Sequence, residues 1–167
     1  MLCNYEFKAR CTDLQQLETL LQPYHPRIIG DDEQVDTYFN VPYGRLKLRE
    51  GKLENALIHY QRSNIRGAKQ SDVQLYQHEP DSSLKQLLTA ALGVLKVVTK
   101  RRRILFVDNV KFHFDEVVGL GTFVEVEAID KDGLIEIDQL QEQCRHFAQL
   151  FKIKETDYIA DSYSDLL

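Results

Sequence analysis

Apolar and polar residues alternate one by one along most of the chain, a pattern typical of strands that bury one face. The clearest example is 3–10, where Cys3 and Phe7 fall on one face while Glu6 and Lys8 fall on the other. The alternating segments are 3–10, 34–40, 44–50, 56–62, 73–77, 94–107, 110–117 and 123–129. The pattern therefore predicts a protein built mainly from strands, about eight of them.

Three other segments carry apolar residues at helical spacing, and they are 12–21, 82–92 and 137–151. Thr12 with Gln15 predicts a capping box at the start of the first. Ser82 and Ser83 predict a cap for the second helix, and Gly93 predicts its end. We expect short amphipathic helices that each cover part of a sheet.

The connecting segments are polar or rich in turn residues. We expect a loop over 24–32, a turn over 42–44 and a polar tail from 153 onward. The stretch 63–71 is either a mobile lid over an opening or a long turn. Because strands and helices do not alternate regularly, the predicted fold class is α+β with an antiparallel sheet.

One predicted strand places three cations on a single face, because Arg45, Lys47 and Arg49 alternate with Leu46 and Leu48. Such a row repels itself unless something anionic lies opposite. Acidic side chains on other strands and a phosphate ligand are both able to supply that charge.

Charges also sort by sign from strand to strand. The acidic members are Glu6, Asp115, Glu125 and Glu127, and the basic members are Lys8, Arg45, Lys47, Arg49, Arg62, Lys100, Arg102 and Lys111. One interpretation is an open antiparallel sheet whose charged face is solvated. The other is a closed antiparallel β-barrel of about eight strands, with helices over its apolar outside and charges lining a lumen for a small ligand. A lumen of this kind suits a polyphosphate held together with Mg²⁺ or Mn²⁺.

Composition restricts the class of protein. The 167 residues, 43% of them hydrophobic, suit a single domain over 1–167. Lys and Arg number 21 against 26 Asp and Glu, and this net charge of −5 argues against a nucleic-acid partner or a membrane-surface binder. The 3 cysteines form no Cys-x-x-Cys pair, and no run of about 18 apolar residues occurs. We expect a soluble, cytoplasmic protein that is not exported.

Other kinds of catalytic site find no support in the sequence. His25, His59, His78 and His146 have no partners at a catalytic spacing, and no Gly-x-x-x-x-Gly-Lys loop is present. We expect His113 to form hydrogen bonds in the lumen rather than to bind a metal.

Five stretches carry a resemblance that follows the chain in order: QVDTYFNVPYGRLKLRE at 34–50, LIHYQR at 57–62, KRRR at 100–103, HFDEVVGLGTFVEVE at 113–127 and SYSDLL at 162–167. Together they resemble the CYTH family of triphosphate tunnel metalloenzymes, and most closely its class IV adenylyl cyclase branch. The resemblance implies a closed antiparallel β tunnel, a requirement for a divalent metal and a triphosphate substrate. Branches of the family make cyclic AMP from ATP or hydrolyse thiamine triphosphate or inorganic triphosphate.

The resemblance also implies roles for individual residues. The family's Glu-x-Glu-x-Lys signature falls on residues 4–8, where Glu6 matches the second Glu, Lys8 matches the Lys, and Asn4 replaces the first Glu. The implied metal ligands are Glu6, Glu125 and Glu127, the implied triphosphate-binding residues are Arg45, Lys47, Arg49, Arg62, Lys100, Arg102 and Lys111, and the implied catalytic residues are Lys8 and Asp115, the latter an acidic position near the metals.

Asn4 is expected to weaken metal binding, because an amide oxygen is neutral and a carboxylate is not. The expected function is conversion of ATP to cyclic AMP plus pyrophosphate, since 34–50 and 113–127 match the cyclase branch and flank the site on its cationic and acidic sides. Two alternatives stay open: hydrolysis of inorganic or thiamine triphosphate, and a catalytically weak module that binds a nucleotide or polyphosphate. The sequence leaves the oligomeric state open, with a homodimer among the options.

Overall fold

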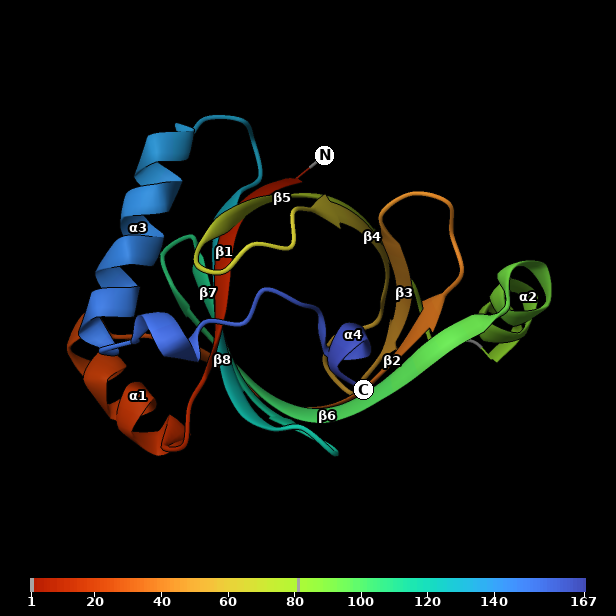
Figure 1. The fold of residues 1–167 in the computed structure, drawn as a ribbon, viewed down its shortest axis with the longest axis horizontal. Coiled ribbons are helices and arrows are strands. Elements are labelled where there is room, and N and C mark those ends of the chain that lie inside the picture. Colours follow the sequence, from red (N-terminus) through yellow and green to blue (C-terminus); the bar gives the residue numbers. More distant parts are fainter. Residues whose placement is uncertain (1, 81) are drawn as a thin grey trace.

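Eight antiparallel strands close into a barrel in the computed structural model, which describes residues 2–80 and 82–167 (Figure 1). The strands are β1 (Leu2–Arg10), β2 (Arg27–Phe39), β3 (Arg45–Glu50), β4 (Ala56–Arg62), β5 (Lys69–Gln77), β6 (Val94–Val107), β7 (Val110–Val117) and β8 (Gly121–Asp130). Their order around the barrel is β1, β5, β4, β3, β2, β6, β7 and β8, and β8 pairs with β1 to complete the ring. The closed-barrel interpretation is confirmed, and the open-sheet interpretation is wrong.

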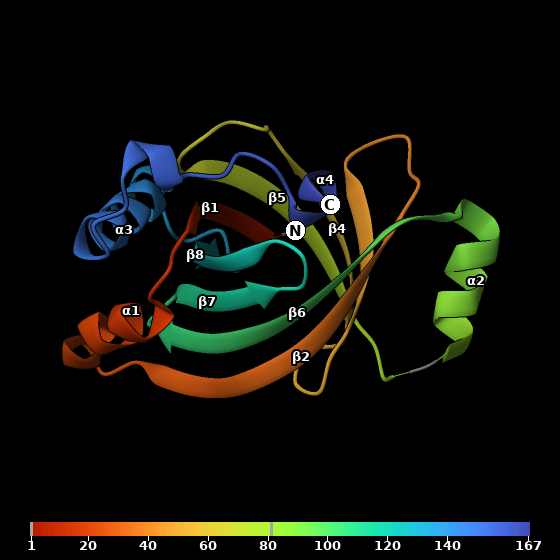
Figure 2. The same cartoon turned by 60° about the horizontal axis from the view of Figure 1, so that its bottom comes forward.

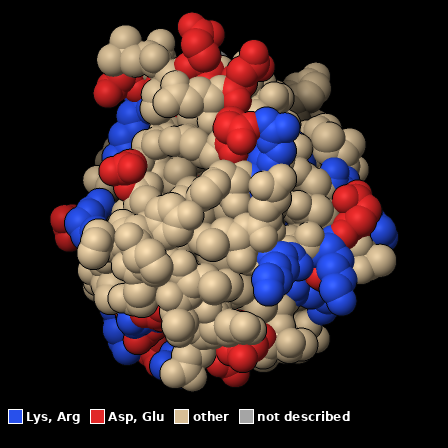
Figure 3. Space-filling model, turned by 90° about the vertical axis from the view of Figure 1, so that its left-hand side faces the viewer, with Lys and Arg blue, Asp and Glu red and all other residues tan. Residues whose placement is uncertain are grey.

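Two helices cover the outside of β1, β7 and β8. The helices are α1 (Leu14–Leu21), α2 (Ser82–Leu92), α3 (Ile137–Leu150) and the short α4 (Tyr163–Leu166), with 3₁₀ turns η1 at Gln22–Tyr24 and η2 at Glu155–Asp157. Phe7, Phe112 and Val126 of the strands pack with Leu17 of α1 and Phe147 of α3 in one buried cluster. The middle of this side of the molecule is largely free of charged side chains (Figure 3). Because the apolar faces of these strands pack against α1 and α3 on the outside, their polar faces point into the barrel.

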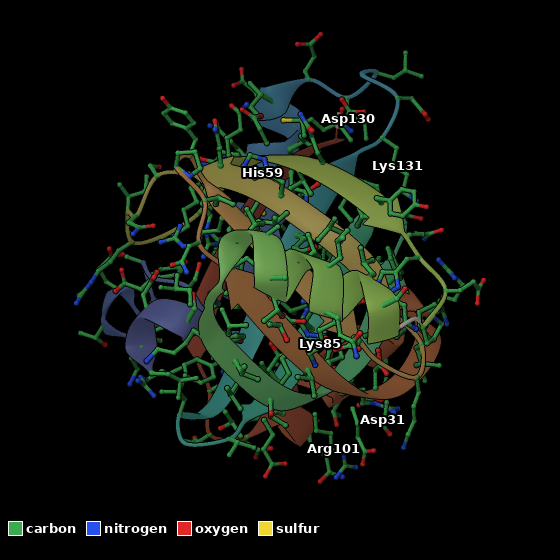
Figure 4. The ribbon with its side chains drawn as sticks, turned by 90° about the vertical axis from the view of Figure 1, so that its right-hand side faces the viewer. Asp31, His59, Lys85, Arg101, Asp130 and Lys131 are labelled. Carbon is green, nitrogen blue, oxygen red and sulfur yellow. The ribbon has the colours of Figure 1, made fainter. Side chains whose placement is uncertain are left out.

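The other two helices lie apart from this cluster. α2 links β5 to β6 and runs across the outside of the barrel, as the views in Figures 2 and 4 agree. Lys85 of α2 forms a 2.7 Å salt bridge with Glu50 of β3, whereas Leu87 is 66% exposed. α4 lies within the ring of strands in Figure 1. No helix in the described part of the chain is both long and apolar enough to cross a membrane.

β2 begins at Arg27, so the loop predicted over 24–32 is wrong for most of its length. The strand pairs with β6 along this stretch, with an irregularity in register between Ile28 and Gly30. Gly30 has a φ of 139°, which residues with a side chain rarely adopt. An irregularity of this kind interrupts the alternation of faces, which explains why the sequence pattern did not reveal the first half of the strand.

β5 begins at Lys69, earlier than predicted, and this leaves 63–68 as the connecting loop in place of 63–71. The Lys69 ammonium donates hydrogen bonds to the carbonyl of Ile65 at 2.8 Å and to that of Ala160 at 2.7 Å. These contacts tie the loop to the C-terminal segment. The structure therefore favours an anchored connection over a mobile lid.

The helix ends follow the sequence only in part. α1 is capped by Asp13, whose carboxylate accepts from the backbone N–H of Gln16 at 2.9 Å, so the capping box predicted at Thr12 is wrong. α2 ends before Gly93 as predicted, with a φ of 73° at that glycine. The cap predicted for α2 at Ser82 falls on a side chain outside the described part of the structure.

Candidate active site

Alternate residues of all eight strands project into the barrel and line a cavity of about 1310 Å³. The predicted site residues in this lining are Glu6, Lys8, Lys47, Arg49, Arg62, Lys100, Arg102, Lys111, Glu125 and Glu127. Asp115 and Arg45 are not among the described lining residues. The barrel thus brings together side chains that lie far apart in the sequence, on β1, β3, β4, β6, β7 and β8.

The two ends of this cavity differ in character. Ser162 and Tyr163 of the C-terminal segment line one end, and Tyr76, Leu84 and Leu87 line the other. Ser162 accepts a hydrogen bond from the last residue of β4, beside the start of β5, whereas Tyr76 lies at the end of β5. The lumen is therefore lined by polar and aromatic groups at one end, and at the other by exposed apolar side chains together with charged ones such as Glu79 and Lys131.

Three basic side chains meet on one buried carboxylate. Asp36 of β2 is fully buried, and its oxygens lie 2.8 Å from Arg49 Nε, 2.8 Å from Lys100 Nζ and 3.2 Å from Lys47 Nζ. Burial alone would raise the pKa of Asp36, but the three cations hold it well below its usual value. Asp36 did not stand out in the sequence, although its alternation with Val35 places it on the polar face of its strand.

Lys100 remains incompletely neutralised in this group. Burial and the nearby charges of Arg102 and Arg49 outweigh the attraction of Asp36 and lower the pKa of Lys100 to about 7. An anion placed beside Lys100 would favour its charged form. This wall of the lumen is therefore suited to receive a phosphate group.

Arg102 is held at the wall by a two-point contact with Asp115. Its Nε lies 2.6 Å from Asp115 Oδ1 and its Nη2 lies 2.5 Å from Oδ2, while Nη2 is also 2.7 Å from Glu125 Oε2. The Tyr163 hydroxyl donates to Asp115 Oδ2 at 2.7 Å. Asp115 thus lies behind Arg102 and orients it. Tyr163 did not stand out in the sequence by itself, although the stretch SYSDLL that contains it belongs to the family resemblance.

The acidic wall combines β1 and β8. Glu6 lies directly opposite Glu127 in the strand register, and Glu125 lies two residues before Glu127 on the same face. Glu6 is 2.5 Å from Arg62 Nη1, and Glu125 is 3.1 Å from Lys8 Nζ. Burial and the charges of Glu6 and Glu125 raise the pKa of Glu127 to about 7. This wall therefore carries negative charge that the basic residues around it only partly offset.

His113 faces the same two glutamates. Its Nδ1 lies 3.2 Å from Glu125 Oε2, and because a carboxylate only accepts, Nδ1 carries the proton. The expected hydrogen bond in the lumen is thereby confirmed. Burial, Arg102 and Lys111 lower the pKa of His113 to about 3, so its ring is neutral. Its buried Nε2 finds no hydrogen-bond partner in the described part of the chain.

These donors fit a divalent cation. Potential ligand atoms of His113, Glu125 and Glu127 all lie within 4.8 Å of one another. Asn4 lines the same cavity at 7% exposure, and its buried Oδ1 has no hydrogen-bond partner among residues 2–80 and 82–167. Buried polar atoms are normally satisfied, and carboxylate and amide oxygens are ligands that Mg²⁺ and Mn²⁺ accept.

One lumen acid was missed because it comes from a turn. Glu54, between β3 and β4, contacts Lys111 Nζ through Oε1 and lies 3.1 Å from Arg49 Nη1 through Oε2. The turn is fixed by Asp32, which is fully buried and accepts the backbone N–H groups of 52–54 at 2.6, 3.0 and 3.0 Å. Alternation describes strands only, so no signal in the sequence pointed to this residue.

Basic residues that are not among the described lining residues have other partners. Arg45 pairs with Asp165 of α4 at 2.7 Å. Arg101 points away from the barrel in Figure 4, and Arg103 pairs with Glu18 of α1 at 2.7 Å. The basic run on β6 therefore lies half inside and half outside the barrel, because successive side chains of a strand point to opposite faces.

Comparison with known proteins agrees with this geometry. The family model described as the CYTH domain matches residues 3–163. No curated protein matches the chain. Among solved structures, a Pyrococcus horikoshii protein is similar with a TM-score of 0.81 at 20% identity, covering 98% of this chain and 99% of that one.

The descriptions of two further solved structures name an enzymatic activity. A candidate adenylate cyclase of Vibrio parahaemolyticus has a TM-score of 0.75 at 20% identity, with 98% of this chain and 96% of that chain covered. A candidate adenylyl cyclase of Hippeastrum, described as having a dominant triphosphatase activity, has a TM-score of 0.65 at 16% identity, with 99% and 93% covered. At these identities the likeness shows a common fold.

Proposed function

The chain belongs to the CYTH domain family, and from this premise we propose that it is a metal-dependent enzyme that converts ATP to cyclic AMP and pyrophosphate. The observation that carries the proposal is the division of charge across one lumen. Lys47, Arg49 and Lys100 lie on one wall, and Glu125 and Glu127 lie on another, around the same cavity. A triphosphate needs cations around its oxygens and a site for its accompanying metal, and this lumen offers both.

The basic wall binds and orients the phosphates in this proposal. Arg49 and Arg102 are each fixed by a carboxylate, through 2.8 Å and 2.6 Å contacts of their Nε atoms with Asp36 and Asp115. Fixed guanidinium groups need no reorganisation as charge develops on the breaking bond, which is the main source of electrostatic catalysis. Asp115 acts as a positioning residue here, since its carboxylate works through Arg102.

The acidic wall would hold Mg²⁺ or Mn²⁺ through the predicted ligands Glu6, Glu125 and Glu127, with Asn4 and His113 beside them. When bound, such an ion neutralises charge on phosphate oxygens. Lys8 lines the cavity 3.1 Å from Glu125, and burial lowers the pKa of its ammonium. We assign Lys8 as the group that exchanges a proton with the reacting hydroxyl, since a lowered pKa eases that exchange.

ATP is favoured over an inorganic triphosphate by the open end of the lumen. Tyr76, Leu84, Leu87 and Phe106 line it, and Tyr76 is 66% exposed. An inorganic triphosphate has no apolar part to contact them, whereas a purine ring stacks well on aromatic and aliphatic side chains.

Hydrolysis of a triphosphate is the second candidate. The same cations would stabilise charge if water attacked the terminal phosphorus, and the Hippeastrum protein of similar fold is described by a triphosphatase activity. A weakly active binding module is the third candidate, because Asn4 removes one carboxylate from the metal site.

One assay separates these candidates. Purified protein is incubated with ATP, inorganic triphosphate or thiamine triphosphate, with Mg²⁺ or Mn²⁺, and the products are separated by chromatography. Cyclic AMP with pyrophosphate is the expected result. Orthophosphate without cyclic AMP would replace the proposal with hydrolysis, and ligand binding without any product would replace it with the binding module.

A further inference from the structure

Glu54 differs from the other lumen acids in where it comes from and in what it contacts. It is carried by the turn between β3 and β4, yet it reaches across the lumen to cations on two different strands. Its carboxylate contacts Lys111 of β7 and lies 3.1 Å from Arg49 of β3. Gln34 of β2 donates a further hydrogen bond to it at 3.2 Å. One carboxylate thus joins two walls of the barrel.

The turn that carries Glu54 is built to hold this position. The Asp32 carboxylate accepts three successive backbone N–H groups, the last from Glu54 itself at 3.0 Å. Gly51 lies so close that an added Cβ would be 2.5 Å from Asp32 Oδ2, so only glycine fits there. Asn55 closes the turn by exchanging hydrogen bonds with Gly51 at 2.9 and 3.2 Å. The position of Glu54 is therefore set by the fold and not by chance on a mobile loop.

Comparison with Asp36 indicates what Glu54 does. Both carboxylates contact Arg49, but the side chain of Asp36 is fully buried whereas that of Glu54 is 24% exposed and lines the cavity. A ligand entering the lumen cannot reach Arg49 by replacing Asp36, which lies behind it. It can reach Arg49 and Lys111 by replacing Glu54.

We propose that Glu54 is an internal counter-anion that occupies the phosphate position between Arg49 and Lys111 and yields it to a phosphate group of the substrate. A carboxylate and a phosphate present similar acceptor oxygens to a guanidinium, so each can satisfy the same donors. Without Glu54, Arg49 would keep only its pair with Asp36, and Lys111 would lose its one salt bridge in the described part of the chain. With it, every ligand that takes this position must first displace a bound anion.

The consequence concerns affinity and release. Displacement weakens binding of every ligand that uses the position, and the return of Glu54 helps a product to leave. Pyrophosphate is a product both of cyclisation and of inorganic triphosphate hydrolysis, so the inference holds for either reaction. It rests on the proposed function only in taking the ligand to be a polyphosphate.

The test compares Glu54→Gln with wild type and with Glu33→Gln. Glu33→Gln makes the same change of charge on the outer surface of the protein. Glu33 pairs there with Lys52 at 2.7 Å, and its side chain is 72% exposed. Binding of inorganic tripolyphosphate and of pyrophosphate is measured by calorimetry at low ionic strength with EDTA, which removes divalent metal. We expect Glu54→Gln to lower the Kd for both anions by about tenfold or more, since one competing charge-assisted contact is removed. Glu33→Gln should stay within about twofold of wild type, because exposed ion pairs contribute little.

Glu54→Asp separates charge from the shape of the turn. It keeps the negative charge, so its affinities should lie nearer to wild type than those of Glu54→Gln. An equal fall in the Kd for Glu54→Gln and Glu54→Asp would overturn the inference, because a changed turn and not a lost charge would then explain the tighter binding. Thermal unfolding without ligand, recorded for each variant, identifies any that has lost its fold, and Glu54→Asp then carries the comparison alone.

The remaining outcomes separate the inference from the proposed function. If wild type binds tripolyphosphate but Glu54→Gln binds it equally well or more weakly, the inference is overturned and the proposed function stands. If wild type binds neither anion while Glu54→Gln gains binding, the inference is supported, and the product assay with Mg²⁺ or Mn²⁺ decides the proposed function separately. If neither protein binds either anion, the inference is overturned, and the proposed function is decided separately by the product assay with Mg²⁺ or Mn²⁺.

Discussion

At the scale of single residues, the acidic wall includes one neutral amide, that of Asn4. The sequence resemblance implies a carboxylate at this position, and the buried Oδ1 of Asn4 lacks a hydrogen-bond partner in the part of the chain that the structure describes. An oxygen in this state can serve as a neutral metal ligand. Its neutrality also limits repulsion in the metal-free protein, where burial and Glu6 with Glu125 already raise the pKa of Glu127 to about 7.

Asn4→Glu should therefore have two opposite effects. Another carboxylate would strengthen metal binding, so we expect the Mg²⁺ concentration for half-maximal activity to fall by roughly threefold to tenfold. The same charge would lower the melting temperature in EDTA, because like charges would then crowd one buried wall. Gln74→Glu, at an exposed position of β5, is the matched control and should change neither quantity. An unchanged Mg²⁺ requirement would place Asn4 outside the metal site.

Glu127→Ala tests the metal site by removing a carboxylate instead of adding one. Glu127 lies among the potential ligands within 4.8 Å of one another, so its loss should abolish metal-dependent turnover at saturating Mg²⁺ or Mn²⁺. Its removal also relieves repulsion with Glu6 directly opposite, so the melting temperature in EDTA should be equal to or higher than that of wild type. Undiminished activity would count against the site.

At the scale of elements, alternation predicted well where strands are regular. The bounds of β4, β6 and β7 match the predicted 56–62, 94–107 and 110–117, and the lumen-facing charges on them follow directly. Alternation failed where a register irregularity at Gly30 hid the start of β2. It also gave no information on side chains that reach the lumen from turns or from the C-terminal segment. Glu54 and Tyr163 are such cases, and only the closed barrel brings them to the strands.

The docking of α4 tests one of these missed contacts. The Tyr163 hydroxyl donates to the buried Asp115 at 2.7 Å, and Tyr163 itself is 3% exposed. Tyr163→Phe should lower the free energy of unfolding by about 1–2 kcal/mol in urea denaturation, since one hydrogen bond to a buried charged group is lost. Arg45→Gln removes the more exposed pair with Asp165 from the same segment and should cost less than about 1 kcal/mol. Equal losses would show that the hydroxyl has no special part in holding α4.

At the scale of the whole molecule, the net charge of −5 conceals an interior rich in cations. Lys8, Arg49, Lys100 and Arg102 are each 6% exposed or less, and buried charge lowers stability unless it is fully paired. These buried cations therefore lower the stability of the barrel, and they also make its lumen ready to bind an anion. A bound triphosphate should return that stability, by about 2.7 kcal/mol at one hundred times its Kd.

The pH dependence of unfolding tests whether the buried Lys100 lowers the stability of the free protein. Burial lowers the pKa of Lys100 to about 7, against 10.5 for a free lysine, so between these values the unfolded chain binds a proton that the folded chain does not. Stability should accordingly rise with pH between about 7 and 10.5, by at most about 1.4 kcal/mol per pH unit from this residue, and below about 7 this residue should add no further dependence of stability on pH. Other groups titrate in the same range, so the informative quantity is the difference between wild type and Lys100→Met in urea denaturation at pH 7 to 9.5. We expect wild type to gain stability relative to Lys100→Met as pH rises, whereas Lys131→Met, at an exposed position, should run parallel to wild type. Parallel curves for wild type and Lys100→Met would mean that Asp36, 2.8 Å away, keeps Lys100 charged throughout, and that the basic wall is already neutralised before any phosphate binds.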